Sequence, residues 1–270
     1  MRRDNLWLIC LALPAGAFFA AFFVLPLARL FLVGGGGGFI AYASILTDRT
    51  YFFSLLATLA LAAATTGATL LISGVAGVFL QRNAFAGRAA LIALLTLPLA
   101  FPGVVVGFMV IVLAGRQGLI GDVTMALTGE RVVFAYSMAG LFMGYVYFSI
   151  PRTMLTVMAT AEKLDPRLEE AARSLGAAPW QVLRDIIIPG LKPALLSAGA
   201  ICFATAMGAF GTAFTLATRI NVLAMVIYTE FTLQANIALA AALSFVLGSV
   251  TWAVLAAART AAGGTVAAAG

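Results

Sequence analysis

Six long runs of hydrophobic residues, separated by short polar stretches, organise this chain. The runs cover residues 6–33, 52–80, 89–113, 133–150, 194–217 and 236–258. A helix needs about 20 residues to cross roughly 30 Å of hydrocarbon, and each run approaches or exceeds that length. Because hydrocarbon offers no water to backbone groups, such segments form helices. The pattern predicts an all-α membrane protein with six transmembrane helices, organised as a single domain over residues 1–270.

The first run also resembles a secretory signal, since Arg2 and Arg3 precede an apolar middle and an Ala-Gly-Ala segment. It extends well past the 7–15 apolar residues of a signal core, so we expect a retained span, and a cleaved signal is the alternative. The five glycines at 34–38 that follow predict a flexible linker on the far side of the membrane.

The third run contains Pro98 and Pro102, followed by Gly103 and Gly107. Two prolines this close kink or break a helix, which a membrane protein tolerates where neighbouring helices or a cavity satisfy the freed carbonyls. The glycines allow another helix to approach closely. Pro98, Pro102 and Gly103 therefore mark a break beside a cavity or a neighbouring helix, and a kink that only serves packing is the alternative.

The fifth run and the stretch after it contain further small residues and an isolated acid. Gly208 and Gly211 weaken the helix and expose backbone, and Thr212 and Thr215 lie beside them. Such small residues also form helix contacts in membranes. Glu230 is the only carboxylate between the fifth and sixth runs. It could meet a cationic solute or a docked binding protein, or it is a solvated loop acid or a partner of Arg219.

A polar elbow at residues 162–192 interrupts the hydrophobic pattern. Asp165 is a good N-cap and Pro166 suits the first helical position, so a short helix should begin there. Gly176 should end this helix. Pro179 should begin a second helix that ends at Pro189 and Gly190. The elbow therefore predicts two short helices outside the bilayer.

The distribution of basic residues gives the orientation. With the N-terminus inside, 11 of the 16 Lys and Arg residues fall on the inner side, so the positive-inside rule predicts N-in and C-in with a cytoplasmic elbow. The inner residues are Arg2, Arg3, Arg82, Arg88, Arg152, Lys163, Arg167, Arg173, Arg184, Lys192 and Arg259. The net charge of +6 is scattered between spans, which does not indicate a nucleic-acid partner.

The residues of the chain exclude several kinds of chemistry. The chain has no histidine and no GxxxxGK[ST] phosphate loop, and Cys10 and Cys202 both lie in apolar runs, so we expect no metal site and no catalytic residues. Acids are absent from the six runs, which argues against a proton-relay pump. The energy source is expected on another chain, where ATP and Mg²⁺ would bind, so this chain is not itself an enzyme.

The elbow carries a family resemblance. Glu170-Ala171-Ala172, then Gly176, Ile186 and Ile188-Pro189, resembles the EAA loop of ABC importer permeases, with Ile188 where leucine is usual. The wider resemblance, over residues 52–259, is to MetI-like permeases, whose loop acts as a coupling helix docked on the ATPase. The positions that this resemblance implies for coupling are Glu169, Glu170, Ala171, Ala172, Leu175, Gly176, Ile186 and Pro189. The alternative is an interfacial helix without a coupling role.

The resemblance implies a multi-pass protein of the bacterial inner membrane, working with an ABC ATPase dimer, a second permease chain and an external solute-binding protein. It points first to a polyamine as solute, and then to iron(III) or an oxyanion. The candidates that it implies for the solute path are Pro98, Pro102, Gly103, Gly208, Gly211, Thr212, Thr215 and Glu230. A stand-alone secondary carrier, or a structural membrane subunit, is the alternative class.

Overall fold

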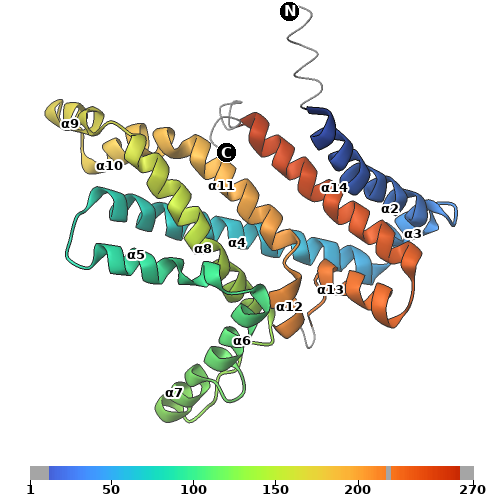
Figure 1. Ribbon diagram of the computed structural model, residues 1–270. Coiled ribbons are helices and arrows are strands. Elements are labelled where there is room, and N and C mark those ends of the chain that lie inside the picture. The colour runs from blue at the N-terminus through green and yellow to red at the C-terminus, as the bar shows by residue number, and fades with distance from the viewer. Residues whose placement is uncertain (1–11, 217–219, 262–270) are drawn as a thin grey trace, which may run out of the picture.

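The computed structural model describes residues 12–216 and 220–261, and within these ranges every regular element is a helix (Figure 1). The chain is helical from Ala12 to Gly35, including η1 (Ala20–Val24) and α2 (Leu25–Gly35). The later elements are α3 (Ile40–Thr47), α4 (Arg49–Arg82), α5 (Arg88–Thr96), η2 (Leu97–Ala100), α6 (Gly103–Ala114), α7 (Leu119–Thr128), α8 (Met138–Lys163), α9 (Pro166–Ser174), α10 (Pro179–Val182), η3 (Leu183–Ile187), α11 (Ile188–Met207), α12 (Phe210–Leu216), α13 (Leu223–Tyr228), η4 (Thr229–Leu233) and α14 (Ile237–Ala261).

Five helical segments of the described ranges are long and apolar enough to cross a membrane: 12–35, 49–82, 103–128, 179–207 and 237–261. The fourth predicted span corresponds to α8, which has 26 residues but includes Pro151 and Arg152 and is less apolar. The all-α class is confirmed, whereas the count of six spans and the N-in/C-in orientation stay predictions.

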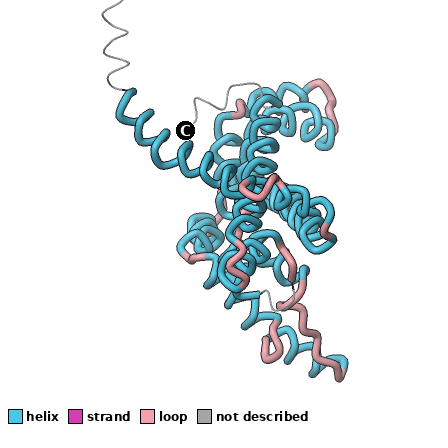
Figure 2. The backbone as a smooth tube through the Cα atoms, turned by 90° about the vertical axis from the view of Figure 1, so that its right-hand side faces the viewer, coloured by secondary structure: helices cyan, strands magenta, loops and turns pink. Residues whose placement is uncertain are grey.

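The N-terminal helix projects from the bundle (Figure 2), and its most apolar stretch buries no residue in the chain. Its last part, α2, packs against α14. Gly34 is buried at this contact, where a Cβ would lie 2.9 Å from the Tyr42 hydroxyl and 3.0 Å from the Ala242 nitrogen. The flexible linker predicted at 34–38 was therefore wrong, because Gly34 and Gly35 complete a helix and a tight turn leads into α3. Arg2 and Arg3 lie outside the described residues.

Breaks at small residues and prolines divide two of the predicted spans. Pro102 lies in extended backbone as the N-cap of α6, so the third run breaks there. The fifth run ends at Gly208, and the chain restarts as α12 at Phe210. Ala217, its predicted end, lies outside the described residues. The stretch between the third and fourth apolar runs contains α7, and the stretch after the fifth run contains α13 and η4.

The second helix of the elbow runs further than predicted. It continues through Pro189 and Pro193 to Met207, giving one helical segment over 179–207. The π-helical turn η3 lies immediately before Ile188 and Pro189. Proline has no backbone N–H to donate, and the i→i+5 hydrogen bonding of a π-helical turn allows the helix to continue through Pro189. The elbow is therefore joined rigidly to a membrane-span candidate, with no proline break between them.

Close packing of α4, α8 and α11 forms the centre of the molecule. Side chains small enough for close approach line α4, where Ser54, Thr58, Thr65, Thr69 and Ser73 are all buried. Hydrogen bonds also join separate helices of the bundle: among them, Ser73 donates to the Ile150 carbonyl at 3.2 Å, and Tyr145 donates to the Ala209 carbonyl at 2.7 Å. Small residues at helix contacts are typical of membrane proteins, where apolar burial alone gives little driving force.

Candidate functional site

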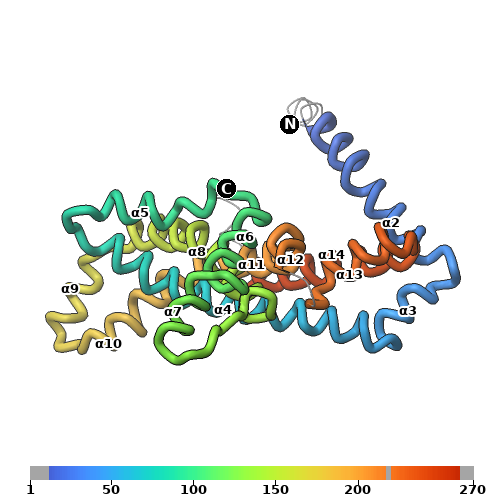
Figure 3. Tube along the Cα trace, turned by 90° about the horizontal axis from the view of Figure 1, so that it is seen from below, coloured from blue at the N-terminus to red at the C-terminus, as the bar shows by residue number. Residues whose placement is uncertain are grey.

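The elbow lies at one end of the elongated molecule, as Figure 3 shows for α9 and α10. Its local structure follows the predicted signals. The Asp165 carboxylate accepts a hydrogen bond from the Arg167 backbone N–H at 3.0 Å, which caps α9, and Pro166 is the first helical residue. Gly176 follows α9 with φ of 85°, a conformation that favours glycine. The predicted start and end of the first elbow helix are confirmed.

Glu169 fixes α9 to the rest of the chain. Its carboxylate pairs with the Arg82 guanidinium at the end of α4, at 2.5 Å, and more weakly with Arg173 at 3.9 Å. The Glu169 side chain is only 13% exposed. Its neighbour Glu170 is exposed. The two acids of the motif therefore differ: Glu169 is occupied within the chain, while Glu170 is free to meet a partner.

The outer surface of the elbow presents large apolar side chains. Leu175 is 90% exposed, and Leu168 and Trp180 are also exposed. These apolar side chains lie on an otherwise polar segment. Exposure of leucine and tryptophan to water is unfavourable, so such a patch indicates contact with another surface. The sequence pattern did not single out Trp180, although its position directly after Pro179 in a polar segment was an available signal. Ala171 is exposed and Ala172 half-buried on the same helix.

A small apolar cluster connects the elbow to the bundle. Val157 and Ala161 of α8 pack with Leu191 of α11, and Leu164 and Ile187 cover them. Gly190 lies beneath Leu164, where a Cβ would come within 2.6 Å of that side chain. Of the remaining coupling candidates, Ile186 is half-buried and Pro189 is exposed. The cluster therefore fixes the two ends of the elbow, at Leu164 and Ile187, to α8 and α11.

The pathway candidates on α6 and α12 are brought together as a close helix contact. Thr212 donates a hydrogen bond to the Gly103 carbonyl at 2.9 Å, and a Cβ on Gly211 would lie 3.1 Å from the Val104 nitrogen. One turn further along α6, a Cβ on Gly107 would overlap the Thr215 hydroxyl. Pro98 is buried nearby in η2. This geometry favours the packing alternative for these residues.

Gly208 and Glu230 are separate from that contact. Gly208 is exposed and lines a mostly apolar groove with Phe210, Tyr228 and residues of α14. Glu230 is only 3% exposed, and its Oε1 accepts a hydrogen bond from the Tyr51 hydroxyl at 3.0 Å. The interpretation of Glu230 as a solvated loop acid was wrong, because η4 places this side chain against α4. Arg219, its other predicted partner, lies outside the described residues.

Two hollows in the described part of the chain contain a basic side chain. Arg49 lines a wide hollow with Ser54 of α4, Tyr136 just before α8 and Asn221 just before α13. Arg152 lines a narrower groove between α8 and α11. Groups of three or more metal-ligating side chains are absent from the described residues.

Comparison with known proteins places these features in context. Residues 70–259 match the family described as "Binding-protein-dependent transport system inner membrane component". A sulfate permease of the chloroplast of Chlamydomonas reinhardtii is 30% identical over 245 residues, covering 88% of this chain and 66% of that protein. The molybdenum transport permease ModB of Escherichia coli is 36% identical over 141 residues, covering 52% of this chain and 61% of ModB.

A crystal structure of a bacterial alginate ABC transporter, solved with a periplasmic protein bound to an alginate pentasaccharide, has the same fold. The TM-score is 0.77 at 16% identity, covering 96% of this chain and 94% of the matched chain. The chain spans about two-thirds or less of the length of the sulfate permease and of ModB. With the family match over most of its length and a shared fold, the chain belongs to the binding-protein-dependent transport system inner membrane components.

Proposed function

We propose that this chain is the permease subunit of an ATP-driven importer in the bacterial inner membrane, and that the elbow couples it to a separate ATPase. The observation that carries the proposal is the exposed apolar surface of Leu168, Leu175 and Trp180 on an otherwise polar segment. A surface of this kind fits a groove in a partner protein.

The coupling would be mechanical. The ATPase dimer binds ATP and Mg²⁺, and its closure moves α9. The Glu169–Arg82 ion pair joins α9 to α4, and the Leu191 cluster joins Leu164, just before α9, to α8 and α11. Rigid movement of these helices would expose a central path alternately to each side of the membrane. For a complete switch, the ATP-bound state must favour one conformation by about 5.5 kcal/mol.

An oxyanion such as sulfate or molybdate is the proposed solute, since the matched permeases are named for these ions. The expected polyamine finds no support among these relatives, and iron(III) finds none either. The other partners proposed are an external solute-binding protein and a second permease chain, identical or homologous. One chain of this size cannot both enclose a path and engage the two halves of an ATPase dimer.

The test is copurification of the ATPase with the tagged chain in detergent, comparing Leu175→Asp with Leu46→Asp. Both leucines are largely exposed, Leu175 at 90% in the elbow and Leu46 at 71% on α3, outside the membrane-span candidates. Placing a charge in an apolar contact should reduce ATPase recovery at least about tenfold for Leu175→Asp. Recovery should be unchanged for Leu46→Asp. Equal recovery with both variants, or no ATPase with the unmodified chain, would contradict the proposal.

A further inference from the structure

Arg152 occupies an unusual position for a charged residue. It lies 14 residues after Met138 and 11 before Lys163, in the middle of α8. At 1.5 Å per residue, the charge is about 16 Å from the Lys163 end of the helix. α8 packs along α4 and α11, both in membrane-span candidates, so Arg152 lies well within the length of the bundle.

The charge on Arg152 has no counter-ion in the described part of the chain. The four ion pairs found there involve Arg82, Arg131, Arg173 and Arg184. A charge at membrane depth is costly, and such residues face a bundle interior or a water-filled cavity, where they mark the path of a solute or ion. Arg152 was predicted to lie on the inner side, just after the fourth apolar run, and α8 continues beyond it to Lys163, as expected.

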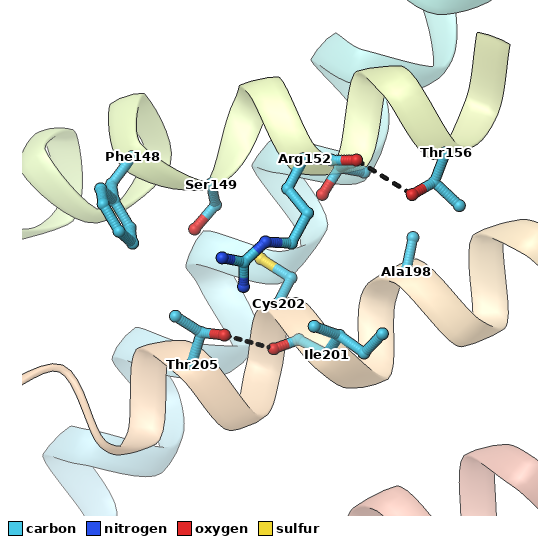
Figure 4. A pocket seen from close by; sticks show the side chains of 9 residues that line it. Phe148, Ser149, Arg152, Thr156, Ala198, Ile201, Cys202 and Thr205 are labelled. Atoms are coloured by element: carbon cyan, nitrogen blue, oxygen red, sulfur yellow. Dashed lines mark hydrogen bonds between the residues drawn. The ribbon is translucent and has the colours of Figure 1, made fainter. Parts of the chain in front are cut away.

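The groove beside Arg152 is polar where the guanidinium points. Figure 4 shows the side chain crossing from α8 toward α11, with Ser149 on its own helix and Cys202 and Thr205 opposite. The enclosed part of the groove has a volume of only about 20 Å³, and the groove opens to the outside of the chain, where the Arg152 side chain is exposed, so an ion would contact the guanidinium at the mouth of the groove. Ser149 makes no hydrogen bond to another described residue, so its hydroxyl is available to a ligand. Thr205 already donates to the Ile201 carbonyl at 2.8 Å.

We propose that the groove between α8 and α11 is an anion-contact site on the solute path, in which Arg152 supplies the charge and Ser149 a hydroxyl donor. A guanidinium presents five N–H donors in a planar fork that matches the oxygens of a tetrahedral oxyanion. An uncompensated positive charge repels a polyamine or a metal cation at the same place. The site therefore selects sulfate- or molybdate-like ions over cations.

The site is suited to a weak, transient contact with an oxyanion and not to tight binding. One guanidinium and one hydroxyl leave several oxyanion oxygens to water, and conduction requires contact weak enough for the ion to leave. Pro151 lies directly before Arg152 and removes one helical hydrogen bond from this turn of α8. The contact could thus shift as α8 moves with the elbow. This inference rests on the proposed permease function.

The experiment uses the complete complex in liposomes, with its ATPase and binding protein, and measures uptake of radiolabelled molybdate and sulfate together with ATP hydrolysis. Arg152→Gln should lower the uptake of both ions at least about tenfold, while stimulation of hydrolysis by the binding protein changes less than twofold. Arg152→Lys keeps the charge but loses the fork, and should retain an intermediate rate. Arg116→Gln, on the loop after α6, is the matched control and should transport normally.

The outcomes separate the site from the function. Normal uptake of both ions by an assembled Arg152→Gln complex would overturn the anion site and leave the permease function intact. An unmodified complex that takes up putrescine but neither anion would overturn both the site and the proposed solute. If Arg152→Gln fails to assemble, Arg152→Lys decides: unchanged uptake and unchanged KM in that variant would overturn the proposed fork contact.

Discussion

Replacing Glu169 by glutamine removes the negative charge that holds α9 against the end of α4. The carboxylate lies 2.5 Å from the Arg82 guanidinium, and the two side chains are 13% and 23% exposed. At this distance, with an effective dielectric constant of about 20, the attraction is about 6–7 kcal/mol before dehydration is counted.

Dehydration of two partly buried charges offsets most of that attraction. Exposed ion pairs contribute about 0–1 kcal/mol, whereas breaking a fully buried pair costs about 3–5 kcal/mol. Arg82 is partly exposed, and Glu169 has a second contact with Arg173 at 3.9 Å. Both features reduce the free-energy cost of breaking this pair below the roughly 3–5 kcal/mol of a fully buried one. We therefore expect a net coupling between Glu169 and Arg82 of about 1–2 kcal/mol, which is roughly a 5- to 30-fold change in an equilibrium constant.

The assay is a double-mutant cycle on the Kd between the detergent-purified permease and its ATPase. Glu169→Gln and Arg82→Gln should each raise the Kd about 5- to 30-fold, because α9 must be held in place before it can dock. The double variant should be no worse than either single one. Exchanging the charges, with Arg82→Glu and Glu169→Arg together, should recover part of the affinity.

Arg173→Gln is the control, since its side chain is mostly exposed and lies 3.9 Å from Glu169. It should change the Kd less than about threefold. The reasoning fails if the single effects of Glu169→Gln and Arg82→Gln multiply in the double variant, because independent sites behave in that way. It also fails if neither single change affects the Kd.

Two further predictions concern stability in detergent, followed by thermal unfolding. Gly107→Ala should destabilise the folded protein by about 1–3 kcal/mol, because the new methyl group overlaps Thr215. Gly74→Ala has no atom within 4 Å of the new Cβ and should stabilise the protein by about 0.5–1 kcal/mol. Equal effects of the two changes would refute the close contact at Gly107. Tyr51→Phe should cost about 1–3 kcal/mol by leaving the buried Glu230 carboxylate without its donor, and an unchanged midpoint would show that Glu230 is solvated.

Local signals in the sequence determined the helices of the elbow and the class of the fold. Asp165, Pro166 and Gly176 act within one or two turns of their own positions, so their effect on α9 could be predicted without the rest of the chain. Long apolar runs likewise specify helices because each run must satisfy its own backbone groups. The residues of the EAA-like loop were recognisable for the same reason, since their spacing is local.

Only the tertiary structure decided which side chains are paired. The sequence places Glu169 beside Glu170, yet one is held by Arg82, 87 positions earlier in the chain, and the other is exposed. Glu230 follows an apolar stretch and is buried by Tyr51 of α4, which no local pattern shows. Arg152 lines a groove because α8 packs beside α11, a neighbour far away in the sequence. Hydrogen bonds and charges act through space between helices, whereas propensity and capping act along the chain.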